Sequence, residues 1–436
     1  MSKQVEYIDT GVNWIGEIPS TWKSKRIKML TRVKRGASPR PIDNPIYFDE
    51  EGEFAWVRIA DVTASERYLE NTTQRLSELG SSASVKRYPD DFFLSIAGSV
   101  GKPIITKIKC CIHDGFVYFP DLKINPEFLY YVFSTGLPYL GLGKLGTQLN
   151  LNTDTVGDIY IPIPNEKEIE NIVSFLDLKT LEIDKIISQK QKLIECLKEE
   201  RMEIINQAVT GNLSNSAKKK PSGFEWVPTI PENWTTNKIK NIAQIFGRIG
   251  YRGYQTSDLV NEGEGAITLS PSNMKEFEMD FTKCTYLSWL KYDESPEIQI
   301  ENGDILFVKT GSTYGKTSFV KNLPEKATIN PQLLVFKDIK INSEFFYYVL
   351  ISQLIQAQVS ISVIGGTIPT ISQEKIGNYY LFVPPMADQT EIIEEINKHL
   401  GHTNLALIKI EQEIELIKEF RTSLINEVVT GKMQLN

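Results

Sequence analysis

"INQAVTG" (residues 205–211) and "INEVVTG" (residues 425–431) are nearly the same phrase, written twice in one chain. Each phrase closes a long stretch with helical periodicity, and each ends in a glycine. A glycine just beyond the last turn of a helix readily takes the left-handed conformation that ends it. The two phrases therefore predict equivalent helix ends at Gly211 and Gly431, and with them an internal repeat.

The repeat extends over most of the chain. "GVNWIGEIPSTW" from Gly11 returns as "GFEWVPTIPENW" from Gly223, and "INPEFLYYVFS" from Ile124 returns as "INSEFFYYVLI" from Ile341. "DDFFLSIAGSVGK" likewise returns as "GDILFVKTGSTYGK", and "LGTQLNLNTDTVGDIYIPIP" as "GGTIPTISQEKIGNYYLFVPP". The chain thus consists of two copies of one plan, in which a globular module precedes a long helix.

The globular modules have the pattern of mixed α/β domains. Short runs rich in β-formers, such as "EFAWVRI" and "ILFVKT", alternate with Gly, Pro, Asn and Asp. Two short helices follow Asn125 and Asn342, whose side chains are suited to accept from the first free N–H groups. These two asparagines are therefore predicted N-caps.

The long helices carry a seam of apolar residues at alternating steps of four and three. Nine of twelve seam positions between Ile169 and Ala208 are apolar, and nine of eleven between Ile393 and Val428. This spacing predicts coiled-coil helices. About forty residues give a helix of roughly 60 Å, and we expect the two helices to cover each other's seams as an antiparallel pair. The central seam residues are Ile183, Ile187, Ile194, Leu197, Leu407, Ile410, Ile414 and Ile417.

Two arginines, Arg201 and Arg421, occupy equivalent seam positions. A charge in a seam is costly unless it is paired. Either the two arginines set the register of the helices, or the seam there faces another protein.

The predicted fold class is α+β, with two similar mixed α/β domains joined by the two helices and related by a pseudo-twofold internal repeat. The expected segments are a first domain with the N-terminal segment, a long helix, a linker, a second domain and a second long helix. Their predicted bounds are 1–163, 164–211, 212–222, 223–385 and 386–436.

Composition and cysteine use favour a cytoplasmic protein. The 41% hydrophobic content is ordinary for a globular chain, and no apolar run approaches the roughly 18 residues of a membrane span. The start lacks the apolar core of a signal peptide. The four cysteines have no disulfide-like spacing, and His399 and His402 have no further ligands in the repeat, so we expect no metal site.

The chain is negatively charged in total, but its basic residues are concentrated in local clusters. The chain carries −7, but residues 166–204 and 388–427 account for −3 and −5, which leaves +1 elsewhere. Residues 21–44 hold eight Lys or Arg against Asp43 alone, and residues 235–255 hold four basic residues and no acid. Clustered basic residues favour contact with nucleic acid, although a solvated basic edge has the same composition.

Two stretches match enzyme motifs in part, but neither has the surrounding residues that the motif requires. "GLGKLG" (residues 141–146) matches G-x-G-x-x-G, but Pro138 precedes it and its equivalent, "ISVIGG", lacks the first two glycines. "GSTYGKT" (residues 311–317) is one residue too short for a phosphate loop, and the sister turn has Pro103 where a hydroxyl is required. Because duplicated chemistry should leave duplicated residues, the chain is predicted to be non-catalytic.

The chain resembles a known family, the specificity (S) subunits of type I restriction–modification enzymes. The resemblance rests on the "W-x-x-x-IP-x-x-W" openings at Trp14 and Trp226, the "GS-x-x-GK" turns, the "GT" segments at Thr147 and Thr367, and the helices that end in "VTG". It covers essentially the whole chain, and the motifs occur in one order, twice.

The resemblance implies more than the residues do. Members carry two target-recognition domains that bind the halves of a split, asymmetric site in double-stranded DNA. Their helices set the spacer and dock two methyltransferase (M) subunits, and two motor–nuclease (R) subunits join. The assembled complex methylates adenine and cleaves DNA. S-adenosylmethionine, ATP and Mg²⁺ are used by the partner subunits, and none is expected to bind this chain.

The candidate DNA contacts lie on the loops that differ between the copies and on the two equivalent turns. Lysines are expected on phosphates, and Arg, Ser and Tyr are expected near bases. The predicted contacts are Lys34, Arg35, Ser38, Arg40, Arg58 and Lys102 in the first module, and Arg248, Tyr251, Arg252, Tyr254, Ser312, Thr313, Tyr314 and Lys316 in the second.

Two other classes of protein stay open from the sequence. A coiled-coil scaffold without DNA specificity would show no selective retention on duplex DNA. A stand-alone nucleotide-dependent enzyme would bind its nucleotide or cofactor as a purified chain. The repeat and the local basic clusters favour DNA recognition over both.

Overall fold

The computed structural model describes residues 6–142, 151–213, 218–248, 250–275, 277–362 and 369–435. The chain divides into two compact units. Unit 1 comprises residues 1–190 and 411–436, and unit 2 comprises residues 191–410. No helix in the described ranges has an apolar stretch long enough to cross a membrane.

Unit 1 contains two packed sheets, one of five strands in the order β4-β12-β9-β10-β6 and one of four in the order β7-β5-β11-β8. Several central strands are buried along their whole length, because both faces of each sheet are covered. The strands are β4 (Lys34–Arg35), β5 (Phe54–Val57), β6 (Tyr68–Leu69), β7 (Gln74–Leu76), β8 (Val85–Arg87), β9 (Phe92–Ser95), β10 (Pro103–Thr106), β11 (Cys110–Ile112) and β12 (Phe116–Tyr118).

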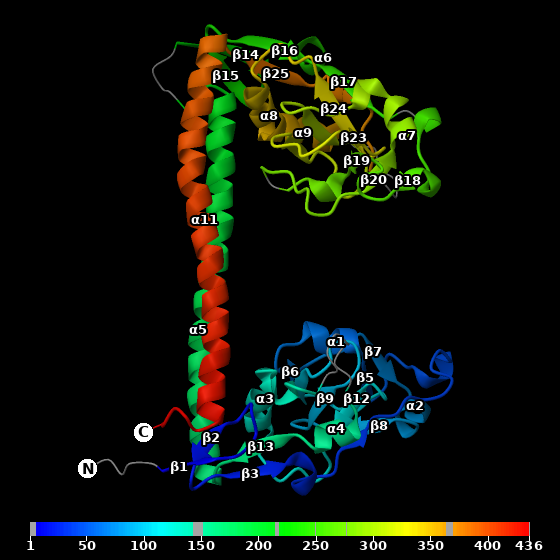
Figure 1. Ribbon diagram of the computed structural model, residues 1–436, viewed down its shortest axis with the longest axis vertical. Helices are drawn as coiled ribbons and strands as arrows, with labels where there is room; N and C mark the ends of the chain where they lie inside the picture. Colours follow the sequence, from blue (N-terminus) through cyan, green and yellow to red (C-terminus); the bar gives the residue numbers. More distant parts are fainter. Residues whose placement is uncertain are drawn as a thin grey trace, which may run out of the picture. The chain divides into compact units, whose positions relative to one another are not determined.

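Two apolar clusters cover the five-stranded sheet. Ala55, Phe93 and Phe116 belong to the cluster between the two sheets. On the other face, Phe128 of α3 (Pro126–Ser134) and Leu176 join the cluster that ties the sheet to the long helices. Figure 1 shows α3 between this sheet and the long helices of unit 1. The shorter helices of unit 1 are α1 (Ile59–Ala64), α2 (Glu78–Ser82) and α4 (Thr153–Gly157).

Unit 2 repeats this plan with two four-stranded sheets, ordered β17-β24-β21-β22 and β18-β20-β19-β23. Its strands are β17 (Gln244–Gly247), β18 (Leu259–Val260), β19 (Gly265–Leu269), β20 (Tyr286–Ser288), β21 (Ile305–Val308), β22 (Thr317–Phe319), β23 (Ala327–Ile329) and β24 (Leu333–Lys337). Its shorter helices are α6 (Ile239–Ile242), α7 (Trp289–Asp293), α8 (Ser343–Ile351), α9 (Gln353–Ser362) and α10 (Gln373–Gly377). Asn125 and Asn342 cap α3 and α8 through their side-chain oxygens, as predicted.

Each unit also has a strand pair that leads into its long helix and a hairpin near a helix end. The equivalent pairs are β3 (Lys23–Arg26) with β13 (Tyr160–Ile163), and β16 (Thr235–Lys238) with β25 (Tyr380–Val383). The hairpins are β1 (Tyr7–Asp9) with β2 (Glu17–Pro19), and β14 (Lys219–Phe224) with β15 (Val227–Pro231).

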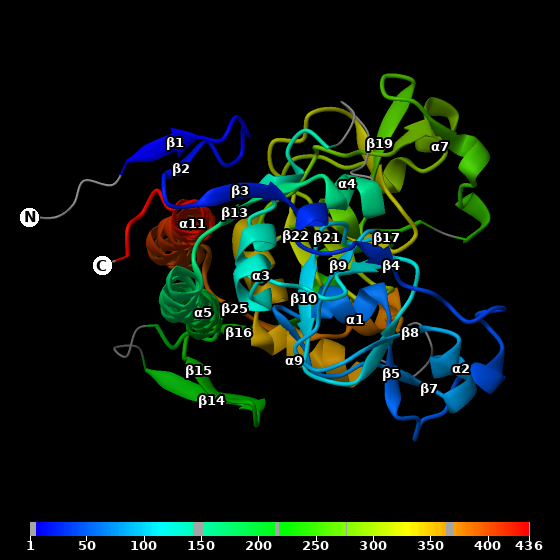
Figure 2. The same ribbon diagram turned by 90° about the horizontal axis from the view of Figure 1, so that it is seen from below.

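The long helices are α5 (Glu166–Val209) and α11 (Met386–Val429), each of 44 residues. They run antiparallel, because Lys190 pairs with Glu413 at 2.5 Å in unit 1 while Arg201 bonds Asn404 at 2.8 Å in unit 2. Figures 1 and 2 show the helices side by side. Among the predicted seam residues, Ile183, Ile194, Leu407, Ile410 and Ile414 are buried, and Ile187, Leu197 and Ile417 are half-buried. The predicted fold class is confirmed.

Both long helices end at the predicted glycines. Gly211 and Gly431 each have φ of +72°. In the first copy Asn212 N–H donates to the Gln207 carbonyl oxygen, and in the second Lys432 N–H donates to that of Glu427. These hydrogen bonds span six residues, as in a Schellman motif, and they satisfy carbonyl oxygens at the helix end.

Candidate nucleic-acid interface

In unit 1, three of the predicted DNA contacts converge on Asp114. Arg35 Nε donates to its carbonyl oxygen, Ser38 Oγ lies 3.1 Å from Oδ1, and Arg40 Nη2 lies 3.4 Å from Oδ2. Arg35 extends from β4, and the other two side chains come from the loop after it. Arg35 and Arg40 stay exposed, so their remaining N–H groups face solvent. Asp114 therefore orders the loop without removing its basic groups from the surface.

The Asp114 carboxylate is held in its charged form. Partial burial works against the charge, but the Ser38 hydroxyl, the residue's own backbone N–H and the Arg35 guanidinium outweigh it, so the pKa of Asp114 lies below its usual range. Lys34, on the same strand as Arg35, is exposed. The loop at residues 34–40 thus presents basic groups around one fixed anion.

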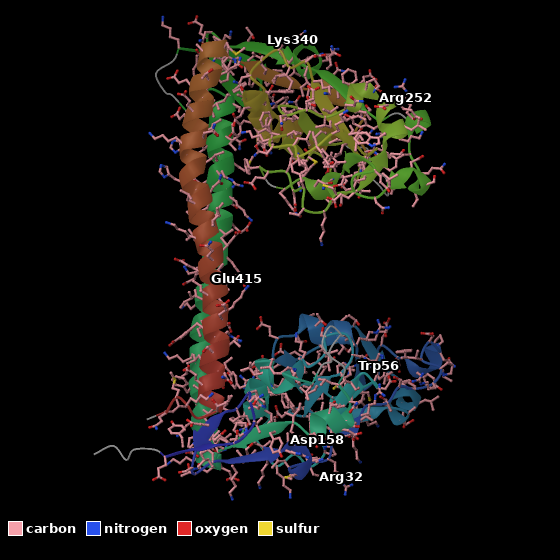
Figure 3. All side chains as sticks on the ribbon, in the orientation of Figure 1. Arg32, Trp56, Asp158, Arg252, Lys340 and Glu415 are labelled. Carbon is pink, nitrogen blue, oxygen red and sulfur yellow. The ribbon has the colours of Figure 1, made fainter. Side chains whose placement is uncertain are left out.

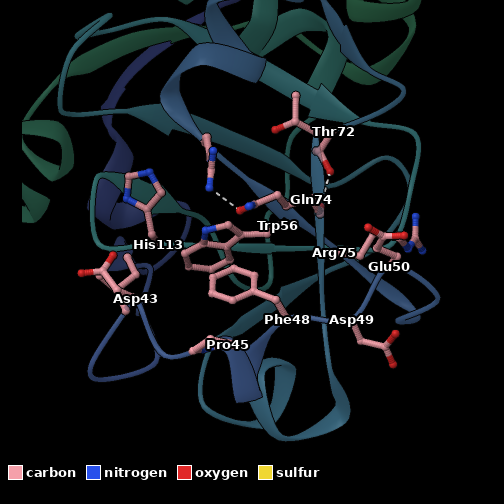
Figure 4. Close-up of a pocket in the computed structure, with 13 residues that line it drawn as sticks. Asp43, Pro45, Phe48, Asp49, Glu50, Trp56, Thr72, Gln74, Arg75 and His113 are labelled. Carbon is pink, nitrogen blue, oxygen red and sulfur yellow. Dashed lines mark hydrogen bonds between the residues drawn. The ribbon is translucent and has the colours of Figure 1, made fainter.

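Arg58 lines a pocket of about 1020 Å³ together with residues that the sequence did not single out. Its Nη2 donates to the side-chain oxygen of Gln74, which lies beside Trp56 in Figure 4. The His113 ring lies 5.8 Å from that of Trp56. Burial lowers the pKa of His113, and Arg35 adds to the effect against the opposing charge of Asp114. Strand pairing brings Gln74 and His113 beside Arg58. Because these residues lie far apart in the sequence, no local motif contains them.

Lys102 is engaged within the protein. Its Nζ donates to the carbonyl oxygens of Thr63, at 3.0 Å, and Ser65, at 2.5 Å, at the end of α1. Burial lowers the pKa of this amine. The predicted phosphate contact by Lys102 would compete with these two bonds, which satisfy carbonyls that the helix leaves free.

Arg248 lies in the interior of unit 2, which corrects the expectation of an exposed contact residue. Only 4% of it is exposed. Nε and Nη2 donate to the Ile329 carbonyl oxygen and the Thr328 hydroxyl, each at 3.0 Å, and Nη1 donates to the Arg252 carbonyl oxygen at 3.2 Å. Its guanidinium also lies 5.4 Å from the centre of the Tyr254 ring. Arg248 therefore positions the loop that carries Arg252 and Tyr254.

That loop brings Arg252 to the edge of unit 2 (Figure 3). Arg252 Nη1 lies 2.9 Å from a Glu297 oxygen, and its side chain is 36% exposed. Tyr254 is half-buried against Arg248. The side chain of Tyr251 lies outside what the structure describes. Arg252 thus remains accessible while its direction is set by Glu297.

The turn at residues 311–316 presents the other predicted contacts of unit 2. Ser312 and Thr313 are exposed, and Tyr314 and Lys316 are half-buried. Gly311 and Gly315 have φ of +112° and +84°, which allow the tight reversal between β21 and β22. The equivalent turn of unit 1 uses Gly98 and Gly101 at +63° and +85°. Residues 143–150 and 363–368, with Thr147, Thr367 and most of "GLGKLG", lie outside the described residues.

Comparison with known proteins gives one family and several relatives. The family model described as the type I restriction modification DNA specificity domain matches residues 19–196 and 231–416. The specificity subunit of the type I restriction enzyme MjaVIII from Methanocaldococcus jannaschii is 22% identical over 438 residues, or 96% of this chain and 94% of that protein. The specificity subunit of the EcoBI enzyme from Escherichia coli is 20% identical over 362 residues, or 79% of this chain and 74% of that protein.

A solved structure concerned with complex assembly and conformational transition of the type I R-M system contains a chain with a TM-score of 0.68. It is 14% identical in sequence and covers 95% of this chain and 99% of its own. At this identity the likeness is one of fold. It extends over nearly the whole length of both chains.

Proposed function

The chain belongs to the type I restriction modification DNA specificity family, and we propose that it is the subunit that recognises the DNA sequence in a type I restriction–modification complex. The observation that carries the proposal is the double family match, with one matched segment in each copy of the repeat. The subunit itself is non-catalytic. The catalytic steps belong to its partners.

In this proposal each unit binds one half of a bipartite, asymmetric site. The frames are equivalent, but the candidate contacts differ: a loop ordered by Asp114 in unit 1, and a loop positioned by Arg248 with an exposed turn in unit 2. Different contact groups on one frame are what two different half-sites require. The basic groups supply phosphate contacts, whose contribution falls as salt rises.

The long helices set the spacer between the half-sites and dock two methyltransferase subunits, and two motor–nuclease subunits join the complex. Support for docking comes from large apolar side chains that the helices leave exposed, which protein partners commonly cover. These are Leu178, Leu181, Ile186 and Leu193 on α5, and Leu405, Ile408, Leu416 and Phe420 on α11. S-adenosylmethionine, ATP and Mg²⁺ bind the partner subunits.

Sequencing the methylated positions in a host that expresses this chain with its methyltransferase partner tests the proposal. The expected result is one bipartite adenine-methylated motif with a fixed gap. Omitting this chain should abolish the methylation. Methylation without a defined motif, or the same motif without this chain, would refute DNA recognition by it.

A further inference from the structure

The pocket beside Trp56 holds a pair of polar side chains whose orientation is fixed by chemistry. Arg58 Nη2 donates a hydrogen bond to Gln74 Oε1 (Figure 4). A guanidinium has only donors, so the amide of Gln74 must turn its oxygen toward Arg58. Its NH₂ group is thereby left to face away from Arg58. The pair therefore directs N–H donors away from the Arg58–Gln74 contact, while the Gln74 oxygen points toward Arg58.

The backbone on both sides of this pair is held by one buried carboxylate. Asp61 is 8% exposed, and its Oδ2 accepts from Arg58 N–H at 2.9 Å while Oδ1 accepts from Thr73 N–H at 3.3 Å. Gln74 lies on β7 directly opposite Trp56 of β5. Gln74 is therefore mounted on a strand and Arg58 at the junction of β5 and α1, instead of on a free loop, which limits the entropy lost on binding.

The rest of the pocket argues against a phosphate as its ligand. Besides Arg75, whose guanidinium donates to the backbone carbonyl oxygens of Gly52 and Glu53, three exposed carboxylates line it, those of Asp43, Asp49 and Glu50. They would repel a phosphate but accept a hydrogen bond from an amino group on a base. Trp56 and the His113 ring supply apolar wall, and the lowered pKa of His113 favours a neutral ring. The lining suits the edge of a base pair.

We propose that Arg58 and Gln74 together recognise a guanine in the half-site bound by unit 1. In the major groove guanine presents two acceptors, N7 and O6, whereas adenine presents one acceptor, N7, and one donor, its N6 amino group. A glutamine on its own complements adenine, because it offers a donor and an acceptor. Here the Gln74 oxygen is turned toward Arg58, and guanine fits the N–H donors that the pair presents elsewhere. Gln74 thus becomes a specificity-determining residue. The inference rests on the proposed function.

Two substitutions at one position separate recognition from a structural role. Gln74→Ala removes the donor and is expected to reduce discrimination for guanine at one position of the first half-site by about tenfold or more. Gln74→Glu keeps an acceptor for Arg58 but presents a second acceptor to DNA. It is expected to shift the preference at that same position toward a base with an amino donor, cytosine or adenine.

The measurement is the methylated motif of a host that expresses each variant with the methyltransferase partner. Gln191→Ala, a change at an exposed glutamine of α5 that does not share a face with the exposed apolar side chains, is the matched control and should leave the motif unaltered. The inference is overturned if Gln74→Ala and Arg58→Ala retain the wild-type motif. Uniformly weaker methylation with every base preference intact would also overturn it. A wild-type chain that directs no bipartite motif would instead refute the proposed function.

Discussion

The guanidinium of Arg421 on α11 lies 3.2 Å from the carboxylate of Asp184 on α5. Arg201 and Asn404, which occupy the equivalent positions in unit 2, are joined by a hydrogen bond of 2.8 Å. Each arginine in the seam thus meets a polar group on the opposite helix. Of the two alternatives that the sequence left open, this arrangement favours a role in setting the register. A slipped register would break both of these pairs.

Asp184→Leu is expected to lower the free energy of unfolding of unit 1 by about 1–2 kcal/mol, because Arg421 would lose its partner at a half-buried position. Asp184→Asn should cost less, since an asparagine serves at the same place in unit 2. Thermal unfolding followed by circular dichroism measures both. Glu182→Gln, which breaks the exposed pair with Lys179, is the control and should stay within about 0.5 kcal/mol. Equal losses for all three would contradict the register role.

Acid should destabilise unit 1 through His113. Burial lowers its pKa in the fold, so the unfolded chain takes up the proton first as the pH falls. The stabilisation from the neutral ring is full above a pH of about 6.5 and is lost as the pH falls toward the lowered value. Denaturant unfolding between pH 8 and 5 should show this loss. His113→Gln should flatten the profile, and an unchanged slope in this variant would contradict the role of His113.

The helix-ending glycines should not tolerate a side chain. A Cβ at Gly211 would lie 2.3 Å from Pro231 Cδ, and one at Gly431 would lie 2.6 Å from Pro19 Cδ. With φ at +72°, alanine at either position should cost at least about 1 kcal/mol in the free energy of unfolding. Gly401, inside α11 with nothing within 4 Å, is the control. Alanine there should stabilise by about 0.5–1 kcal/mol, and a loss of stability there would contradict this account.

The two arginines of the unit 2 loop should behave differently. Arg248→Ala should lower the free energy of unfolding by about 3 kcal/mol, because two buried hydrogen bonds and one partly buried hydrogen bond are lost. Arg252→Ala should change it by less than about 1 kcal/mol but weaken binding to the cognate DNA. Denaturant unfolding and fluorescence anisotropy with labelled duplex separate the two effects. Unchanged binding would remove Arg252 from the contact set.

Lengthening both long helices by one heptad should widen the gap in the recognised site. Insertions after Lys190 and after Ile410 keep the seam in phase and add about 10 Å, or roughly three base pairs. The methylated motif is expected to keep both half-sites and gain spacer. Four-residue insertions put the seam out of phase and serve as the control, with reduced stability expected. An unchanged gap in the heptad variant would contradict the proposed spacer role.

The fold could be predicted because its signals are local or repeated. The seam spacing in α5 and α11, the caps at Asn125 and Asn342, and the paired "VTG" endings each depend on a few neighbouring residues. Each of these signals occurs in both copies of the repeat. A match that occurs in one copy only, such as "GLGKLG", could therefore be discarded as accidental. The strand order could not be predicted, because pairings such as β5 with β11 join segments more than fifty residues apart.

The candidate site was predicted less completely. Basic clusters indicated the loops, but composition does not distinguish an arginine that faces solvent from Arg248, which holds three acceptors inside unit 2. The sequence did not indicate Asp114, Gln74 or His113, because none of them belongs to a motif or to a basic cluster. Gln74 and His113 join the site when β5 pairs with β7 and β11, and Asp114 joins it when β4 pairs with β12.

Segments near the start and the end of the sequence meet in unit 1, where Tyr7 Oη donates to the Gly431 carbonyl oxygen at 3.1 Å. At the equivalent place in unit 2, a short segment carries the chain from Gly211 into β14. A circular permutant with a peptide joining the old ends and a new start at that segment should therefore fold alike and bind the same DNA. The order in which the two half-sites are encoded is then a property of the gene, not of the folded protein.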